Sequence, residues 1–249
     1  MSLPRTLAEG TLARIVERFG LTEERAAGGG HHMTLLSPIS PEPVGSLRLF
    51  RGKRGDGATP VQKVVAVSLV VPAIHLDSHM VFAFTPADSA VPHFTIDSVG
   101  TAEFFAFHLD LIPRADLGAS LAYMNATLLP LTETFAAAQG IEGLTPAKLS
   151  PRQYALMSPW MLAFRATPAA FAKVAAPVDA YLTHWMKLAT EGIAPSVLAE
   201  TPADRWAERD ARNRAALFNP ETDPVWSQVD RLLGTAVSAK IRDVLKGQE

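Results

Sequence analysis

The stretch from residue 45 to residue 113 constrains the fold most, because it is a succession of short strand-like segments. Each segment is rich in β-branched and aromatic residues and is bounded by Pro, Gly, Ser or Asp, as strands and their turns usually are. The segments are GSLRLFRG, VVAVSLVVP, HMVFAF, PHFTIDSV and AEFFAFHLDLIP. Five short strands in succession predict an antiparallel sheet.

Helical patterns lie on both sides of this stretch. Apolar residues recur at helical spacing within residues 5–26, before the helix-breaking run of glycines at 28–30. After residue 113 the helical spacing returns at 114–140, 169–192, 202–217 and 225–246, with one more strand at 159–166. Strands first and helices later predict an α+β sandwich. Residues 51–60 are typical of a flexible hairpin loop, and no repeat divides the chain, so we expect a single domain over residues 1–249.

The composition excludes several classes of function. The 23 basic and 25 acidic residues leave a net charge of -2, which does not favour nucleic acid as a partner. The chain has no cysteine, so disulfides, thiolate metal sites and cysteine nucleophiles are excluded. No apolar run approaches the roughly 20 residues of a membrane-spanning helix, and the N-terminus carries acids where a signal peptide is apolar. We therefore expect a cytoplasmic protein without a membrane partner.

The 50 residues from Val64 to Pro113 carry an unusual set of charges. They contain no Lys or Arg, yet they hold five acids and four of the seven histidines of the chain. In PHFTIDSV the strand period places His93, Thr95 and Asp97 on one face of the sheet. If helices cover both faces, this polar face must line a cavity, where a buried acid can hold and donate a proton. In the following segment Asp110 and Arg114 could equally pair with each other or act in a site.

A metal site is a competing interpretation of the same region. His75, Asp77 and His79 alternate along HLDSH, a spacing that could supply the two histidines and one carboxylate of a non-haem iron oxygenase. Three ligands on one strand face reach poorly around a single ion, which counts against this interpretation. Nucleotide cofactors and serine hydrolases are not indicated, because the sequence has neither a dinucleotide-binding glycine loop nor a Gly-x-Ser-x-Gly elbow.

Several segments resemble a known family. SAVPHFTID followed by FFAFHLDLIPRADL resembles plant red chlorophyll catabolite reductase, a relative of the ferredoxin-dependent bilin reductases. Further similarity lies in MLAFRATP at 161–168 and in ETDPVWSQVDRLLG at 221–234. The resemblance implies a three-layer α/β/α sandwich with a central antiparallel sheet of about six strands. It places an open-chain tetrapyrrole between the sheet and the C-terminal helices.

The resemblance also implies an activity. Members of this family reduce CH-CH groups of linear tetrapyrroles with electrons taken singly from ferredoxin, through radical intermediates and without a bound cofactor. Asp97 matches the acid of the central strand, and Asp223 matches the aspartate of the C-terminal Asp-Pro segment, so both are expected to donate protons. His93 is expected to assist Asp97, although a histidine in this position could equally be satisfied by a backbone carbonyl. Asp223 has a structural alternative as well, as the N-cap of a helix that begins at Pro224.

The remaining residues that the resemblance implicates bind substrate. They are Thr95, Phe94 and Arg165, the last as a partner of a propionate or merely of a neighbouring acid. One departure concerns the histidine that phycocyanobilin-forming members carry on the preceding strand, because Val81 occupies that position here and His79 lies two residues away. This favours the red chlorophyll catabolite type.

A second hypothesis is a tetrapyrrole-binding protein without catalysis.

The catalytic hypothesis needs a docking surface for ferredoxin. Ferredoxins are acidic, and six basic residues are available to dock one: Lys148, Arg152, Lys173, Lys187, Lys240 and Arg242. The particular pigment, the double bond reduced, the natural electron donor and the oligomeric state stay open at this point.

Overall fold

The computed structural model describes residues 2–55, 57–199, 201 and 205–248. Within this part of the chain, nine strands form one sheet in which every neighbouring pair is antiparallel. The order across the sheet is β1-β3-β4-β5-β6-β7-β9-β8, with β2 paired to β3. The strands are β1 (Thr22–Glu24), β2 (Met33–Ser37), β3 (Ser40–Arg51), β4 (Lys63–Val71), β5 (Leu76–Phe84), β6 (His93–Gly100), β7 (Phe105–Ile112), β8 (Leu144–Pro146) and β9 (Leu162–Ala166).

Helices precede, interrupt and follow the strands. They are α1 (Leu3–Phe19), α2 (Leu121–Thr127), α3 (Thr132–Gln139), α4 (Pro151–Leu156), α5 (Pro168–Phe171), α6 (Ala175–Glu191), α7 (Pro195–Leu198), α8 (Trp206–Leu217), α9 (Val225–Leu233) and α10 (Thr235–Lys246). Local signals fix several of their ends. The Ser2 hydroxyl accepts a hydrogen bond from the Arg5 amide at the start of α1, and α1 ends where Gly20 adopts a left-handed conformation.

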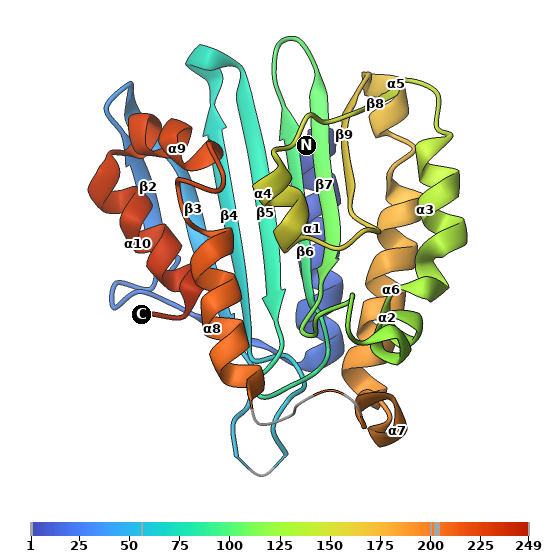
Figure 1. Cartoon of the computed structure of the whole chain (residues 1–249). Coiled ribbons are helices and arrows are strands. Elements are labelled where there is room, and N and C mark those ends of the chain that lie inside the picture. The colour runs from blue at the N-terminus through green and yellow to red at the C-terminus, as the bar shows by residue number, and fades with distance from the viewer. Residues whose placement is uncertain (1, 56, 200, 202–204, 249) are drawn as a thin grey trace.

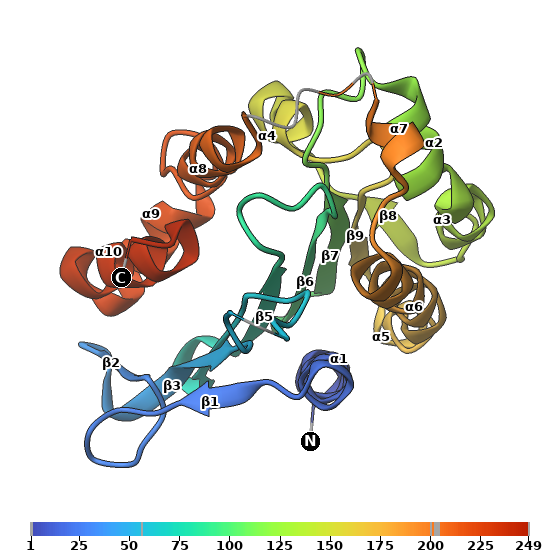
Figure 2. The same cartoon turned by 90° about the horizontal axis from the view of Figure 1, so that it is seen from below.

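The helices form two layers, one on each face of the sheet (Figures 1 and 2). On one face α1 lies across β5 and β6, and α6 packs near β7. The other face is covered by α8, α9 and α10. This arrangement is the three-layer sandwich with an antiparallel sheet that the sequence predicts.

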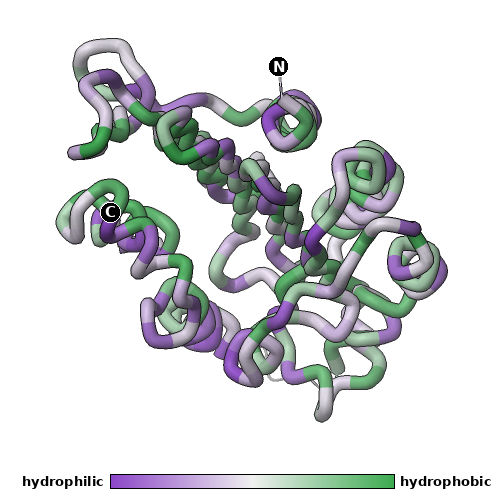
Figure 3. The backbone as a smooth tube through the Cα atoms, turned by 90° about the horizontal axis from the view of Figure 1, so that it is seen from above, coloured by the Kyte–Doolittle hydropathy of each residue, from purple (hydrophilic) through white to green (hydrophobic). Residues whose placement is uncertain are grey.

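Each face of the sheet has its own apolar core. Phe94, Ile96 and Leu109 belong to the core beneath α1 and α6. Leu49 and Phe84 belong to the core beneath the C-terminal helices. The covering helices carry both hydrophobic and hydrophilic residues along their length (Figure 3), as amphipathic helices do. In the described part of the chain no helix is both long and apolar enough to cross a membrane.

The structure differs from the sequence-based expectations mainly at turns and edges. The sheet has more than the expected six or so strands. The additional strands β1, β2 and β8 were not predicted because they are short and lack a clear apolar alternation. The opening helix ends at residue 19 rather than 26, and residues 22–24 form β1. The helix expected at 225–246 is broken by Gly234, whose φ of 83° separates α9 from α10. The first residues of the helix expected at 202–217 lie outside the described residues.

Candidate functional site

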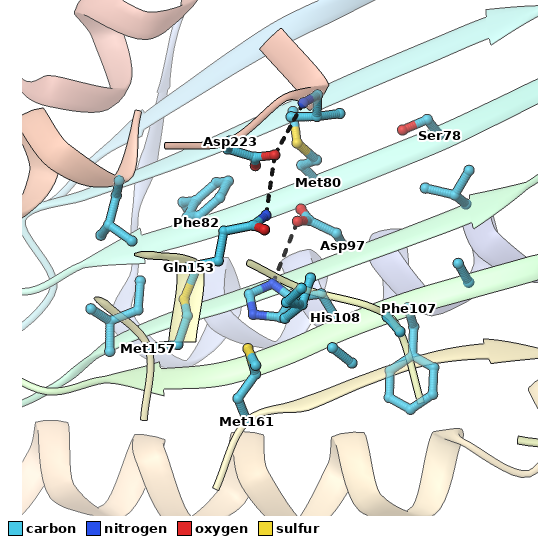
Figure 4. A pocket seen from close by; sticks show the side chains of 18 of the residues that line it. Ser78, Met80, Phe82, Asp97, Phe107, His108, Gln153, Met157, Met161 and Asp223 are labelled. Atoms are coloured by element: carbon cyan, nitrogen blue, oxygen red, sulfur yellow. Dashed lines mark hydrogen bonds and ion pairs between the residues drawn. The ribbon is translucent and has the colours of Figure 1, made fainter. Parts of the chain in front are cut away.

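A pocket with a volume of about 280 Å³ lies between the sheet and the C-terminal helices (Figure 4). Its floor comes from β5, β6, β7 and β9, and its walls come from α4, the loop after α4 and the segment that joins α8 to α9. The lining is mostly apolar and includes Met80, Phe82, Met157, Met161, Phe218 and Trp226. The polar side chains in the lining belong to Ser78, Asp97, His108, Gln153 and Asp223. An apolar cavity with a few convergent polar groups is the usual form of a small-molecule site.

Asp97 and His108 face each other on the floor of this pocket. They are cross-strand partners in the pairing of β6 with β7, so both side chains project from the same face of the sheet. His108 Nδ1 lies 3.6 Å from Asp97 Oδ2, a contact drawn as a dashed line in Figure 4. Asp97 Oδ1 and His108 Nε2 are buried and have no hydrogen-bond partner among the described residues. The pair therefore keeps one oxygen and one ring nitrogen for a ligand.

His108 holds its proton more firmly than an ordinary histidine does. Burial disfavours the charged ring, but the neighbouring Asp97 carboxylate, with Asp110 and Asp223 further away, outweighs burial and raises the pKa of His108. A ring nitrogen that faces a carboxylate carries a hydrogen, so Nδ1–H is directed at Asp97. The pair thus stores an exchangeable proton inside an apolar pocket.

Asp223 approaches from the opposite wall, on the loop between α8 and α9 (Figure 4). Its Oδ1 accepts a hydrogen bond from the Val225 amide at 3.1 Å and a longer one from Gln153 Nε2 at 3.4 Å. Burial raises the pKa of Asp223, the Val225 amide lowers it, and the charge of Asp97 raises it again, so the net shift is upward. Asp97 and Asp223 therefore face the same pocket, one from its floor and one from its wall.

Thr95 and Phe94 lie outside the pocket lining. Thr95 is buried on the same face of β6 as Asp97, and its hydroxyl has no hydrogen-bond partner among the described residues. Phe94 points to the opposite face, where its ring centre lies 5.5 Å from that of Trp185 in the other core. The structure therefore does not bring Phe94 together with Asp97.

Arg165 lies at the edge of the site rather than inside it. It is exposed on β9, directly opposite the pocket-lining residue Ala106 of β7. Its guanidinium carbon lies 4.4 Å from the centre of the Phe104 ring, which holds it by a cation–π contact. From this position a ligand that protrudes from the pocket can meet a positive charge.

His93 belongs to a separate, fully buried cluster on the same face of the sheet. Its Nε2 lies 2.7 Å from Asp210 Oδ1 of α8, and its Nδ1 accepts a hydrogen bond from the Thr85 amide at 3.1 Å. The Arg114 guanidinium lies 3.5 Å from the same Asp210 oxygen. Burial, aided by the charge of Arg114, outweighs Asp210 and lowers the pKa of His93 to about 3. With both ring nitrogens engaged by other partners, His93 is not placed to assist Asp97.

Asp110 and Arg114, from the segment LDLIPR, do not pair with each other. Asp110 accepts hydrogen bonds from the Ser158 amide at 2.9 Å and from the Ser158 hydroxyl at 2.5 Å, which fixes the loop between α4 and β9. Arg114 contacts Asp210 of α8 and donates to the carbonyl oxygen of Ala87. The two residues thus anchor two segments that cover the pocket face, and their role is structural.

The alternative metal site is not assembled. Residues 72–74 form a 3₁₀ turn, so His75 precedes β5, is exposed and adopts a left-handed conformation with φ of 51°. It therefore does not alternate with Asp77 and His79 along a strand, as the sequence suggested. His79 Nε2 instead lies 2.7 Å from Asp77 Oδ1, and the described residues contain no group of three His, Cys, Asp or Glu side chains arranged to hold a metal ion.

Of the polar residues that line the pocket, Ser78, His108 and Gln153 were not predicted from the sequence. A signal for His108 existed, because His108 and Asp97 are equally far from the turn at 101–104 and a tight hairpin makes such residues cross-strand neighbours. No comparable signal existed for Gln153, since α4 reaches the pocket only through tertiary packing.

No protein-family model and no curated protein matches the sequence. Among solved structures, the chain is similar to phytochromobilin synthase from tomato, whose selenomethionine form was crystallised in complex with biliverdin. The match has a TM-score of 0.73 and covers 98% of this chain and 83% of that one, at 15% sequence identity. At this identity the likeness establishes the fold, and it confirms the layered sandwich of the resemblance noted in the sequence.

Proposed function

We propose that this chain binds an open-chain tetrapyrrole in the pocket between the sheet and the C-terminal helices and reduces it, with electrons from a reduced ferredoxin. The observation that carries the proposal is the placement of two aspartates and a histidine around one apolar cavity. The likeness to a protein crystallised with biliverdin supports the choice of ligand class.

The lining suits a flat, conjugated and largely apolar ligand. Thioether side chains adapt to the faces of such a ligand, and Met80, Met157 and Met161 supply three of them. The pocket is not sealed, because the Asp97 side chain keeps 28% of its surface exposed. A pigment longer than the cavity therefore extends its polar substituents outward, where we propose that Arg165 binds a carboxylate.

Reduction of a carbon–carbon double bond requires two electrons and two protons. We propose that Asp97 and Asp223 supply the protons, one from each wall. The raised pKa of Asp223 favours the protonated carboxyl that a proton donor needs. Lys148 and Arg152 are exposed beside residues that line the pocket, and they offer a positive rim to an acidic electron-carrying protein.

The proposal is tested with biliverdin and reduced ferredoxin under anaerobic conditions. We expect a shift of the pigment absorption on mixing, followed by bleaching or a new product spectrum when electrons are supplied. Asp97→Asn and Asp223→Asn should bind the pigment and reduce it slowly. Asp179→Asn on α6 is the matched control, because Asp179 is a surface residue paired with Arg14 far from the pocket face.

Two results would contradict the proposal. Absence of any spectral shift with biliverdin or with red chlorophyll catabolite would contradict tetrapyrrole binding. A shift that no electron donor converts into product would leave a pigment-binding protein without catalysis.

A further inference from the structure

Three of the five buried side-chain atoms that lack a hydrogen-bond partner among the described residues gather in one place. They are Thr95 Oγ1, Asp97 Oδ1 and His108 Nε2. Thr95 and Asp97 are two residues apart on β6, and His108 pairs with Asp97 across the sheet. Buried polar groups in proteins are nearly always hydrogen-bonded. Thr95 lies outside the pocket lining, but Asp97 and His108 line the pocket, where a ligand can supply the missing partners of these two.

The two unpartnered atoms of the Asp97–His108 pair have complementary chemistry. Asp97 Oδ1 accepts a hydrogen bond, and the Nε2–H of a charged imidazole donates one. Since Nδ1–H is directed at the Asp97 carboxylate, the ring can give up only its Nε2 proton without breaking that contact. The proton that is free to leave the pair is therefore the one on Nε2.

We propose that His108 is a further catalytic residue of this pocket, which donates its Nε2 proton to the bound pigment while Asp97 holds the ring through Nδ1. This inference rests on the proposed function and changes one role in it. Asp97 stays a carboxylate that orients His108, His108 delivers one proton, and Asp223 delivers the other. The pigment gains one electron from the reduced ferredoxin and one proton from His108. The ring becomes neutral and later recovers a proton from solvent.

The surroundings of His108 support this role. The acids that face it are Asp97 on β6, Asp110 on its own strand and Asp223 on the opposite wall, and each of them, when ionised, favours the charged ring. Asp110 is held by Ser158, so Asp97 and Asp223 are the acids of this set that line the pocket. In this arrangement Asp97 keeps the imidazolium charged and oriented until the pigment arrives.

The test compares His108→Asn with His31→Asn, the same substitution at an exposed histidine that pairs with Glu23 at the surface. In single-turnover reduction of biliverdin, we expect His108→Asn to lower the rate by about 100-fold or more, as for loss of a general acid. The Kd for the pigment should change by less than about tenfold, since one hydrogen bond is lost. The His31 variant should behave as the wild type.

A structural role for His108 would not reproduce the pH dependence. The wild-type rate should fall as the pH rises through the raised pKa of His108, and His108→Asn should lose this limb of the profile. In the ligand-free protein, a pH titration followed by ¹⁵N NMR of the histidine rings should show a raised pKa for His108 in the wild type and a lower one in Asp97→Asn. The His108→Asn spectrum assigns the signal.

The outcomes separate the two claims. If the wild type reduces biliverdin and His108→Asn does so at the same rate with the same pH profile, the inference is overturned and the proposed function stands. If the NMR titration shows that the pKa of His108 is not raised in the wild type, the inference is likewise overturned. If the wild type reduces no tetrapyrrole at all, the proposed function fails and the donor role of His108 fails with it.

Discussion

Two histidine–aspartate pairs lie on the same face of the sheet, and they differ in how completely they are satisfied. His93 and Asp210 are sealed between β6 and α8, and both ring nitrogens of His93 have partners. His108 and Asp97 line the pocket, and each keeps one unpartnered atom. The pKa shifts are opposite, downward for His93 and upward for His108. The comparison teaches that two pairs of the same residue types differ in their free hydrogen-bonding atoms, and we propose that this difference separates a structural pair from a chemical one.

The largest effect on stability is expected from the sealed pair. Asp210→Ala removes the carboxylate that faces His93 and Arg114, and it leaves a buried guanidinium without that partner. Breaking a buried charge network in this way costs about 3–5 kcal/mol of unfolding free energy. Urea denaturation measures it, with Asp179→Ala as the surface control. A loss below about 1 kcal/mol would mean that the sealed cluster does not hold α8 on the sheet.

The pair that lines the pocket, His108 and Asp97, is the open pair, and a substitution there should affect turnover much more than stability. Asp97→Asn keeps the size of the side chain and should alter the free energy of unfolding by less than about 1 kcal/mol, because Asp97 is partly exposed and its contact with His108 is long, at 3.6 Å. Turnover of the pigment should fall by about 100-fold or more, since the ring of His108 loses the carboxylate that keeps it charged. Unfolding curves and single-turnover rates are measured on one preparation. A large loss of stability would refute the distinction between the sealed pair and the open pair.

The sequence predicts only one member of each pair, His93 of the first and Asp97 of the second. The alternation in PHFTIDSV places His93, Thr95 and Asp97 on one face, and the structure agrees. The alternation does not reveal that α8 arrives over His93 and leaves Asp97 open, because the partner Asp210 lies 117 residues further along the chain. The face on which a strand residue lies is a local property. Whether its hydrogen-bonding groups find partners depends on which distant helix covers that end of the strand.

The same limit explains the errors at the edges of the fold. The central strands β4 to β7 have long apolar patterns and were predicted, whereas β8 has three residues and forms only because β9 offers it an edge. The break between α9 and α10 depends on the positive φ of a single glycine, Gly234, within a continuous helical pattern. Such features are set by tertiary packing rather than by periodicity.

The pH dependence of stability should distinguish the two histidines by sign. The folded pKa of His93 lies near 3, below its ordinary value, so unfolding takes up a proton and stability falls as the pH drops below about 6.5, by at most about 1.4 kcal/mol per pH unit. The folded pKa of His108 is raised, so its contribution is complete below the ordinary value and is lost as the pH rises through the raised one. Urea titrations from pH 4.5 to 8.5 measure both slopes.

Single variants assign each slope. His93→Gln should flatten the acid side, and His108→Asn should flatten the alkaline side. If His108→Asn instead flattened the pH dependence of stability on the acid side, the pKa of His108 would be lowered, as that of His93 is, and the contrast between the two pairs would fail.

The smallest effect is expected at Gln153, which joins α4 to the loop of Asp223. Its Oε1 accepts from the Ser150 amide in the capping box of α4, and its Nε2 donates to Asp223. Gln153→Glu keeps an oxygen for the cap but places a second carboxylate beside Asp223, which should raise the pKa of Asp223 further. Repulsion between partly exposed charges is worth less than about 1 kcal/mol, so the pKa of Asp223 should rise by about half a unit. Because Asp223 is the second proposed proton donor, the alkaline limb of turnover that remains in a His108→Asn background should move up by the same amount. Ala155→Glu, which adds the same charge on an exposed position of α4, should leave the limb in place. An equal shift in both variants would show that Asp223 senses the overall charge of α4 rather than a contact with Gln153, and Asp223 would then lie outside the open site that the comparison defines.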